Sequence, residues 1–250
     1  SRDPKSILKE CDQLTTDGYK EVTLLGQNVD SYLWYGGGAK KDFKKASNEN
    51  KENSLNFSDL LDKIAQVNPK LRIRFSTSNP QDMGIAVIDT MSKHANICNH
   101  IHLPVQSGSS RILKLMNRGY DREKYFKLID DIKKRIPDCA ISMDMIIGFC
   151  TETENDHKDT LSLMDYVSYD FGYMFKYSER PNTLAQRKFK DDVNEVQQGT
   201  ECGGSRQLRC RSTLSRSSSQ ARREQPGGLP GRSPLAACRM RPQSSGPALP

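Results

Sequence analysis

The 250-residue chain contains no continuous apolar run of the ~18 residues that a membrane span needs. Its first residues also lack the charged and then apolar pattern of a secretory signal peptide. Its seven cysteines have no C-x-x-C pair and stand at irregular intervals, at positions 11, 98, 139, 150, 202, 210 and 238. Such a set argues against a disulfide framework and against metal-binding or catalytic cysteines. We therefore expect no membrane partner, reduced thiols and a cytoplasmic location, or a mitochondrial one if the parent protein is eukaryotic.

The last 52 residues lack Lys, Ile, Val, Asp, Asn and every aromatic residue, whereas the preceding part uses all of them. Residues 199–250 are instead rich in Arg, Ser, Gly and Pro, and all 9 of their basic residues are Arg. Upstream, Lys outnumbers Arg by 20 to 9. This change predicts a core domain over residues 1–198 and a non-native, disordered tail over residues 199–250, from a frameshift, a fusion or an unspliced intron. A natural disordered basic tail is the alternative.

The net charge of +7 lies entirely in this tail, which holds 9 Arg and 2 Glu. Residues 1–198 hold 29 Lys and Arg against 29 Asp and Glu. A strongly basic chain would suggest a nucleic acid or an anionic surface as its partner. Because the folded part is neutral, any contact with RNA has to be argued from local sites.

Helical and extended patterns alternate along residues 3–177. Asp3 and Pro4 open the first helix, which ends at Gly18. Further helices are predicted over residues 59–67 with Ser58 as the cap, 83–94, 110–136 with a break at 118–120, and 153–167. Strands are predicted over residues 20–26, 71–75, 97–105, 139–149 and 171–177, and residues 34–55 read as a long surface loop. This order indicates an α/β fold with parallel strands joined by right-handed crossovers, in an open or closed barrel.

Polar or glycine-containing turns follow these strands, and the clearest occupy residues 102–110 and 144–149. At the catalytic face of an α/β barrel, such turns expose side chains and free backbone N–H groups. We expect one cavity to be ringed by the residues at five strand ends, which are Gln27, Asn28, Ser76, Ser78, Gln106, Ser107, Gly148, Ser178 and Arg180. For each single residue the alternative is a turn former or a helix cap.

His100 and His102 alternate within one predicted strand, so both side chains lie on the same face. A metal site is one interpretation, but no third ligand accompanies them, and buried hydrogen-bonded histidines are favoured. Asp144 stands among apolar neighbours, where an unpaired carboxylate would be costly. Its expected partner is a ligand hydroxyl or ammonium in the cavity, or a structural Arg or Lys.

Several segments form a pattern typical of one enzyme family. They are LLGQNV at 24–29, RFSTSNP at 74–80, residues 102–110 with LKLMNRGY at 113–120, DMIIG at 144–148 with ETE at 152–154, and YSERP at 177–181. Because these segments occur in this order, the chain resembles the radical SAM methylthiotransferases over residues 1 to about 198. Among them, it resembles the MiaB-type tRNA enzymes. The resemblance stops at Gly199, in agreement with a foreign tail.

The resemblance implies a partial TIM-like (βα)6 radical SAM barrel that lacks its first strand and its cluster loop. It implies transfer of a methylthio group to C2 of an isopentenyl adenosine beside the tRNA anticodon. The implied cofactors are S-adenosylmethionine and two 4Fe–4S clusters. The implied partners are the tRNA anticodon stem-loop and an electron donor protein.

The cluster ligands of this family are absent from the chain. One cluster is held by a C-x3-C-x2-C loop and the other by three cysteines of an N-terminal domain. Thiolates are required to hold the cluster that binds the cofactor and delivers the electron. We therefore expect the chain as given to be an inactive fragment, without metal ligands, that also lacks the family's C-terminal RNA-binding domain. The absent first strand predicts an unpaired sheet edge and poor solubility.

By resemblance, ten residues are candidates for binding S-adenosylmethionine: Gly26, Gln27, Asn28, Ser76, Ser78, Gln106, Ser107, Asp144, Gly148 and Arg180. The turn at 26–28 would contact the methionyl amine, and the serines at 76 and 78 would lie near the carboxylate. Positions 106 and 107 would lie near the ribose, and the glycine at 148 would allow close approach of the adenine. Arg180 would meet the carboxylate or an RNA phosphate. Cys150 departs from the Pro that is more common in the family, and no residue is assigned a catalytic role.

Three functions remain open at this point. The first is a fragment of the isopentenyl-adenosine methylthiotransferase, which the sequence segment PVQSGSS at 104–110 favours. The second is a methylthiotransferase that modifies a ribosomal protein or threonylcarbamoyl adenosine. The third is a binding protein without catalysis that keeps contacts to S-adenosylmethionine or RNA.

Overall fold

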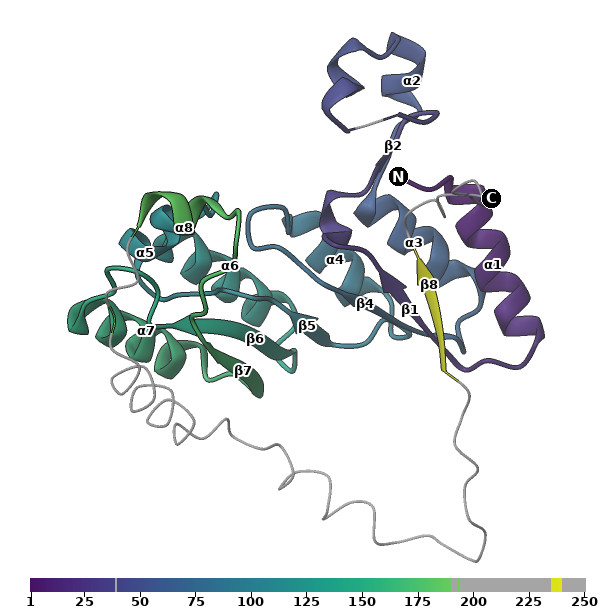
Figure 1. Ribbon diagram of the computed structural model, residues 1–250. Coiled ribbons are helices and arrows are strands. Elements are labelled where there is room, and N and C mark those ends of the chain that lie inside the picture. Colours follow the sequence, from purple (N-terminus) through teal and green to yellow (C-terminus); the bar gives the residue numbers. More distant parts are fainter. Residues whose placement is uncertain (39, 190–192, 194–234, 240–250) are drawn as a thin grey trace, which may run out of the picture. The chain divides into compact units, whose positions relative to one another are not determined.

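The computed structural model describes residues 1–38, 40–189, 193 and 235–239 (Figure 1). The chain divides into two compact units, Ser1–Asn99 with Gly231–Pro250 and His100–Pro230. Each unit contains a parallel sheet of three strands, with order β4-β1-β8 in the first and β5-β6-β7 in the second. The α/β class and the parallel strands are confirmed, and the strand ladders form two sheets instead of one closed barrel.

The first unit begins with α1 (Pro4–Thr16), which leads into β1 (Glu21–Leu25). The Asp3 side chain accepts a hydrogen bond from Ser6 N at 3.0 Å, and Pro4 follows it, so the predicted start of this helix is confirmed. The first unit also contains α3 (Phe57–Val67), β4 (Arg72–Ser76) and α4 (Ile85–Lys93). Val22, Leu24 and Ile73 from the two strands are fully buried.

The predicted cap of α3 is wrong. Asn56 caps this helix, because its side chain accepts from Asp59 N at 3.1 Å while the Asp59 carboxylate accepts from Asn56 N at 3.0 Å. Ser58 lies inside the first turn and donates to Ala86 O at 3.0 Å. The helix starts earlier because Phe57 is buried, where its ring meets Phe75 with centroids 5.3 Å apart.

The predicted long loop at 34–55 contains regular structure. After η1 (Val29–Ser31), the antiparallel pair of β2 (Leu33–Trp34) and β3 (Leu55–Asn56) closes this segment. Between these strands lie η2 (Lys40–Lys45) and α2 (Asn48–Glu52). Tyr35 is buried against Phe43, with ring centroids 5.2 Å apart, so aromatic packing orders part of this segment.

The tail contributes one strand, β8 (Leu235–Arg239). It pairs with β1 in parallel, from Glu21 opposite Leu235 to Leu25 opposite Arg239. In this pairing, the backbone groups of the five residues are satisfied on the edge of β1, and the disorder of the tail stays a prediction. The same pairing covers the β1 edge that we expected to be open. The remainder of the predicted tail lies outside the described residues.

The second unit contains β5 (His100–His102), β6 (Ala140–Ile147) and β7 (Phe171–Lys176), with β6 in the centre. Its helices are α5 (Ser110–Leu115), α6 (Arg122–Arg135), α7 (Glu154–Val167) and the short α8 (Leu184–Lys188), which the sequence did not indicate. The predicted break between α5 and α6 is confirmed. The strand predicted over 97–105 is shorter, with three residues in the ladder.

The two faces of β6 differ in burial. Ile141, Met143, Met145 and Ile147 lie on one face and are buried. The alternate residues, including Asp144 and Ile146, lie on the other face. None of the helices in the described part of the chain is both long and apolar enough to cross a bilayer.

Candidate functional site

The turns that follow β1 and β4 lie side by side in the first unit. Gly26 N donates to Ser76 O, and Val29 N donates to Thr77 O, both at 3.3 Å. These bonds bring the predicted residues at 26–28 next to those at 76 and 78. Four of them, Gln27, Asn28, Ser76 and Ser78, are residues that we placed at strand ends, and their contacts with a cofactor stay predictions.

Asn28 carries an unsatisfied acceptor in this group. Its Nδ2 donates to Asp82 Oδ2, which fixes the orientation of the amide because a carboxylate only accepts. The Asn28 Oδ1 atom is buried, and no hydrogen-bond partner for it lies among the described residues. A buried acceptor without a donor costs free energy. An ammonium or hydroxyl group of a ligand would satisfy it.

Ser78 forms a hydrogen bond within the protein, and its contact with a cofactor stays a prediction. It is buried, and its hydroxyl donates to Asp30 Oδ1 at 3.5 Å, while Asn79 N donates to Asp30 Oδ2 at 2.9 Å. Asp30 therefore holds the turn after β4, a role that no pattern in the sequence indicated. Burial raises the pKa of Asp30 to about 7, although the hydrogen bonds from Asn79 and Ser78 oppose this shift.

Asp30→Asn should remove one pH-dependent contribution to the free energy of unfolding. An unfolded Asp has a pKa near 3.9, whereas that of Asp30 is raised to about 7 in the folded chain. The folded state therefore binds more protons between about pH 4 and pH 7, so the contribution of Asp30 to stability falls as pH rises through this range. A shift of about three units corresponds to roughly 4 kcal/mol at most.

Urea unfolding at pH 5, 6, 7 and 8 measures this effect. We expect Asp30→Asn to gain stability relative to the wild type as pH rises. Asp12→Asn is the matched control, since Asp12 is exposed on α1. A constant stability difference between Asp30→Asn and the wild type across this range would contradict the prediction.

A cavity of about 480 Å³ lies at the carboxyl ends of β6 and β7 in the second unit. Gln106 reaches it beside β6, because Gln106 N donates to Asp144 O and Ile146 N donates to Gln106 O, both at 2.9 Å. Four of the residues that line this cavity were predicted as site residues, and six were not. The lining consists of Gln106, Asp144, Ile146, Phe175, Lys176, Tyr177, Ser178, Arg180, Thr183 and Ala185.

Ser107 and Gly148 do not line this cavity. Ser107 is fully buried, and its hydroxyl accepts from Ser109 N at 3.2 Å. Gly148 has a φ of 74°, which favours glycine, and its N–H donates to the Glu152 carboxylate, as does that of Phe149 at 3.0 Å. Both residues build turns, the alternative raised for each strand end, and their cofactor contacts stay predictions. Glu152 belongs to the ETE segment of the sequence, but its role as the acceptor for this turn was missed.

The two histidines are hydrogen-bonded to one hydroxyl. Ser142 Oγ lies 3.1 Å from His100 Nε2 and 3.0 Å from His102 Nδ1. His102 Nε2 lies 3.4 Å from Asp144 Oδ2, so the partner of this carboxylate is a histidine and not the Arg or Lys that we considered. The hydrogen-bonded interpretation is thus supported, although both rings are half-buried and not fully buried. These contacts orient Asp144 at the wall of the cavity.

The cysteines in the described residues do not form a metal site. Cys11 and Cys150 are buried, and Cys98 and Cys139 are partly exposed free thiols. Burial raises the pKa of Cys139 to about 12, which disfavours the thiolate that a metal requires. Across the described residues, no group of three or more His, Cys, Asp or Glu is placed to hold a metal ion. An iron–sulfur cluster therefore does not fit this part of the chain.

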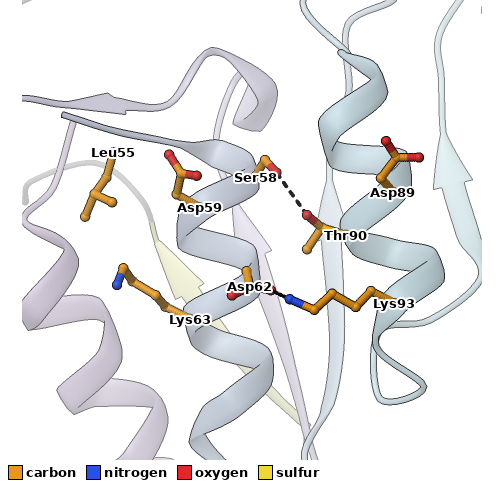
Figure 2. A pocket seen from close by; sticks show the side chains of 8 residues that line it. All are labelled: Leu55, Ser58, Asp59, Asp62, Lys63, Asp89, Thr90 and Lys93. Carbon is orange, nitrogen blue, oxygen red and sulfur yellow. Dashed lines mark hydrogen bonds and ion pairs between the residues drawn. The ribbon is translucent and has the colours of Figure 1, made fainter. Parts of the chain in front are cut away.

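A second hollow, of about 460 Å³, lies between α3 and α4 (Figure 2). Ser58 and Thr90 are hydrogen-bonded across it at 2.9 Å, and Lys93 Nζ lies 2.8 Å from Asp62 Oδ1. Hydrogen bonds from His94 and Lys93 lower the pKa of Asp62. Figure 2 shows the Ser58–Thr90 and Asp62–Lys93 pairs bridging the two helices. Since its polar groups tie the helices together and none of our candidate residues lines it, this hollow is not the predicted site.

The comparison with known families decides the class of the protein. Residues 1–164 match the Radical SAM superfamily. This chain belongs to that superfamily. Membership implies S-adenosylmethionine and a 4Fe–4S cluster as cofactors. The cavity at Gln106 in the second unit offers polar groups that fit S-adenosylmethionine, whereas no set of cluster ligands lies in the described residues.

Relatives with curated names extend this assignment. The chain is 66% identical over 195 residues to the tRNA-2-methylthio-N(6)-dimethylallyladenosine synthase of Christiangramia forsetii, covering 78% of this chain and 40% of that protein. It is 48% identical over 195 residues to the protein of the same name from Bacteroides fragilis, with the same two coverages. The chain thus spans about two fifths of the length of these relatives.

A solved structure supports the fold. Coproporphyrinogen III oxidase from Escherichia coli, described as a radical SAM enzyme, matches with a TM-score of 0.51 at 16% identity. The match covers 81% of this chain and 54% of that one. The α/β radical SAM fold predicted from the sequence is therefore confirmed.

Proposed function

We propose that this chain is part of a tRNA methylthiotransferase that adds a methylthio group to C2 of isopentenyl adenosine beside the anticodon. The observation that carries the proposal is the 66% identity over 195 residues to a synthase named for this product. The whole enzyme would use S-adenosylmethionine and two 4Fe–4S clusters. Its partners would be the tRNA anticodon stem-loop and an electron donor protein, in the cytoplasm.

The contribution of this chain is to bind and orient. In the first unit, Asn28 Oδ1 is a buried acceptor for which no donor lies among the described residues, so an ammonium or hydroxyl group could donate to it. In the cavity, the Asp144 carboxylate can accept a hydrogen bond from a ribose hydroxyl or an amine, and its contact with His102 orients it. Arg180 can form paired hydrogen bonds with a carboxylate or a phosphate. S-adenosylmethionine, when bound, supplies the methyl group and the radical chemistry.

No redox step is assigned to the residues described here. The superfamily's cluster needs thiolates, and the described cysteines do not gather into a set that could hold it. We therefore assign cluster binding to other parts of the longer proteins that this chain resembles.

An exchange experiment tests the proposed function. Residues 1–198 replace the matching segment of the Christiangramia forsetii synthase, and the hybrid is expressed in cells that lack their own enzyme. Mass spectrometry of tRNA nucleosides should detect 2-methylthio-N6-dimethylallyladenosine. Methylthiolated threonylcarbamoyl adenosine, or a modified ribosomal protein, would instead support the second function. A folded hybrid without any of these products would refute an enzymatic role and favour the binding protein.

Asp144→Ala in the same hybrid should lower product formation about tenfold or more, because a hydrogen bond to a charged group typically contributes ~1.5–3 kcal/mol. Asp89→Ala is the control, since Asp89 lines the second hollow and not the cavity. Equal yields from the two variants would show that Asp144 does not contact a ligand.

A further inference from the structure

Three aromatic side chains form a continuous row on the edge strand β7. Phe171, Tyr173 and Phe175 alternate along the strand, so all three lie on one face. Their exposed fractions are 50%, 55% and 51%. The ring centroids of Phe171 and Tyr173 are 4.7 Å apart, and those of Tyr173 and Phe175 are 6.2 Å apart. We call these three residues the aromatic row.

The aromatic row lies on the same face of the sheet as the ligand-binding groups of β6. The register places Ser142 opposite Phe171, Asp144 opposite Tyr173, and Ile146 opposite Phe175. Residues in register on parallel strands point to the same side of the sheet. The buried residues at 141, 143, 145 and 147 belong to the other side.

The aromatic row is continuous with the cavity of the candidate site. Phe175 lines that cavity together with Asp144 and Ile146, and Tyr173 follows two residues earlier on the strand. Lys176 and Arg180 place positive charge in the cavity wall, whereas the aromatic row offers uncharged rings. A polar cavity that leads onto an apolar face suits a ligand with a polar head and an apolar substituent. Half-exposed aromatic rings grouped in this way are also typical of binding surfaces.

We infer that the aromatic row selects the substrate by contacting the apolar group on N6 of the target adenosine. This inference rests on the proposed function and names what distinguishes its substrate. The base would lie in the cavity beside Phe175, where an aromatic ring can stack on it. The dimethylallyl group would lie on Tyr173, since alternate residues on a strand are about 6 to 7 Å apart, comparable to the length of a five-carbon group.

The same face disfavours a charged substituent. A threonylcarbamoyl group carries a carboxylate, which would lose its hydration against the rings of the aromatic row. The aromatic row therefore favours the dimethylallyl group by apolar contact and rejects the threonylcarbamoyl group by desolvation.

Binding of short RNA hairpins to the full 250-residue chain tests the inference. The hairpins differ only in one loop adenosine, which is unmodified, N6-dimethylallylated or N6-threonylcarbamoylated, and fluorescence anisotropy gives each Kd. We expect the dimethylallylated hairpin to bind about tenfold more tightly than the unmodified one, the lower end of what a small apolar group contributes in a pocket. Tyr173→Ala should reduce this ratio to about twofold or less, and Tyr173→Phe should preserve it.

Tyr166→Ala is the matched control, because Tyr166 is 49% exposed on α7, outside the aromatic row and the cavity lining. It should leave the ratio unchanged, and thermal unfolding verifies that each variant is folded. Equal binding of all three hairpins by the wild type, or an unchanged ratio in a folded Tyr173→Ala, would overturn the inference and leave the proposed function to the exchange experiment. Failure of the wild type to bind any hairpin would also overturn it. A clear preference combined with an inactive hybrid would refute the proposed function instead.

Discussion

Gly108→Ala is expected to destabilise the second unit by about 3 kcal/mol or more. A Cβ atom at this position would lie 2.4 Å from Thr160 Cα, 2.7 Å from Asp159 O and 2.8 Å from Thr160 N. All three are backbone atoms of α7, so no side-chain rotation can relieve the overlap. The Gly108 N–H also donates to Thr160 Oγ1 at 3.0 Å, and a shift of α7 would break this bond. The chemical reason for glycine here is the close approach of the 106–109 turn to the helix.

Urea unfolding of the variant and the wild type measures this loss. Gly84→Ala is the control, because a Cβ there would meet nothing within 4 Å and Gly84 has an ordinary φ of −93°. We expect the control to change the free energy of unfolding by about 1 kcal/mol or less, as for other cap positions. If the two glycine variants lost equal stability, the close approach would not be the cause.

Asp156→Ala should have the second large effect, a loss of about 3 kcal/mol or more at neutral pH. Asp156 is 5% exposed at the start of α7. Its carboxylate accepts from Ser109 Oγ at 2.6 Å and from Thr153 N at 2.9 Å, and it pairs with Arg111. The variant would leave these donors without their acceptor and would remove the capping box of α7.

The pH dependence gives this prediction a second measurement. Burial alone would raise the pKa of Asp156, but hydrogen bonds from Arg111, Ser109 and Thr153 lower it well below its usual range. A carboxyl with a lowered pKa contributes stability above about pH 4, and this contribution is lost as pH falls below that value. The difference between wild type and Asp156→Ala should therefore shrink on acidification.

Asp159→Ala is the matched control, because Asp159 lies one turn further along α7 with an exposed side chain. Its loss of stability should be small. If Asp159→Ala and Asp156→Ala gave the same unfolding curves from pH 3 to pH 7, the network around Asp156 would not stabilise the chain.

The predicted helix starts that the structure confirms are those that depend on residues close together in the sequence. Asp3 followed by Pro4 starts α1, because caps depend on backbone groups within three residues. The start of α3 was wrong since two cap formers, Asn56 and Ser58, stand two positions apart. Burial of the intervening Phe57 decides between them, and burial depends on contacts with β4.

The candidate site shows the same division. Gln106, Ser178 and Arg180, which we placed at strand ends, line one cavity, because parallel strands place their carboxyl ends at one edge of a sheet. Asp30 could not be found in this way, since its role depends on the N–H of Asn79, a residue 49 positions away. The aromatic row was visible as alternation in the sequence, but its exposure and its continuity with the cavity were not.

The sequence by itself determined the α/β alternation, the superfamily and the positions of the strand-end turns, because these follow from hydrophobic periodicity, capping residues and short motifs. Only the tertiary structure decided which strands pair, that Leu235–Arg239 lies along β1, that Ser78 and Ser107 turn inward, and that Asp144 is oriented by His102. The physical reason is that burial and hydrogen-bond partners depend on packing between segments far apart in the chain, which no local pattern contains.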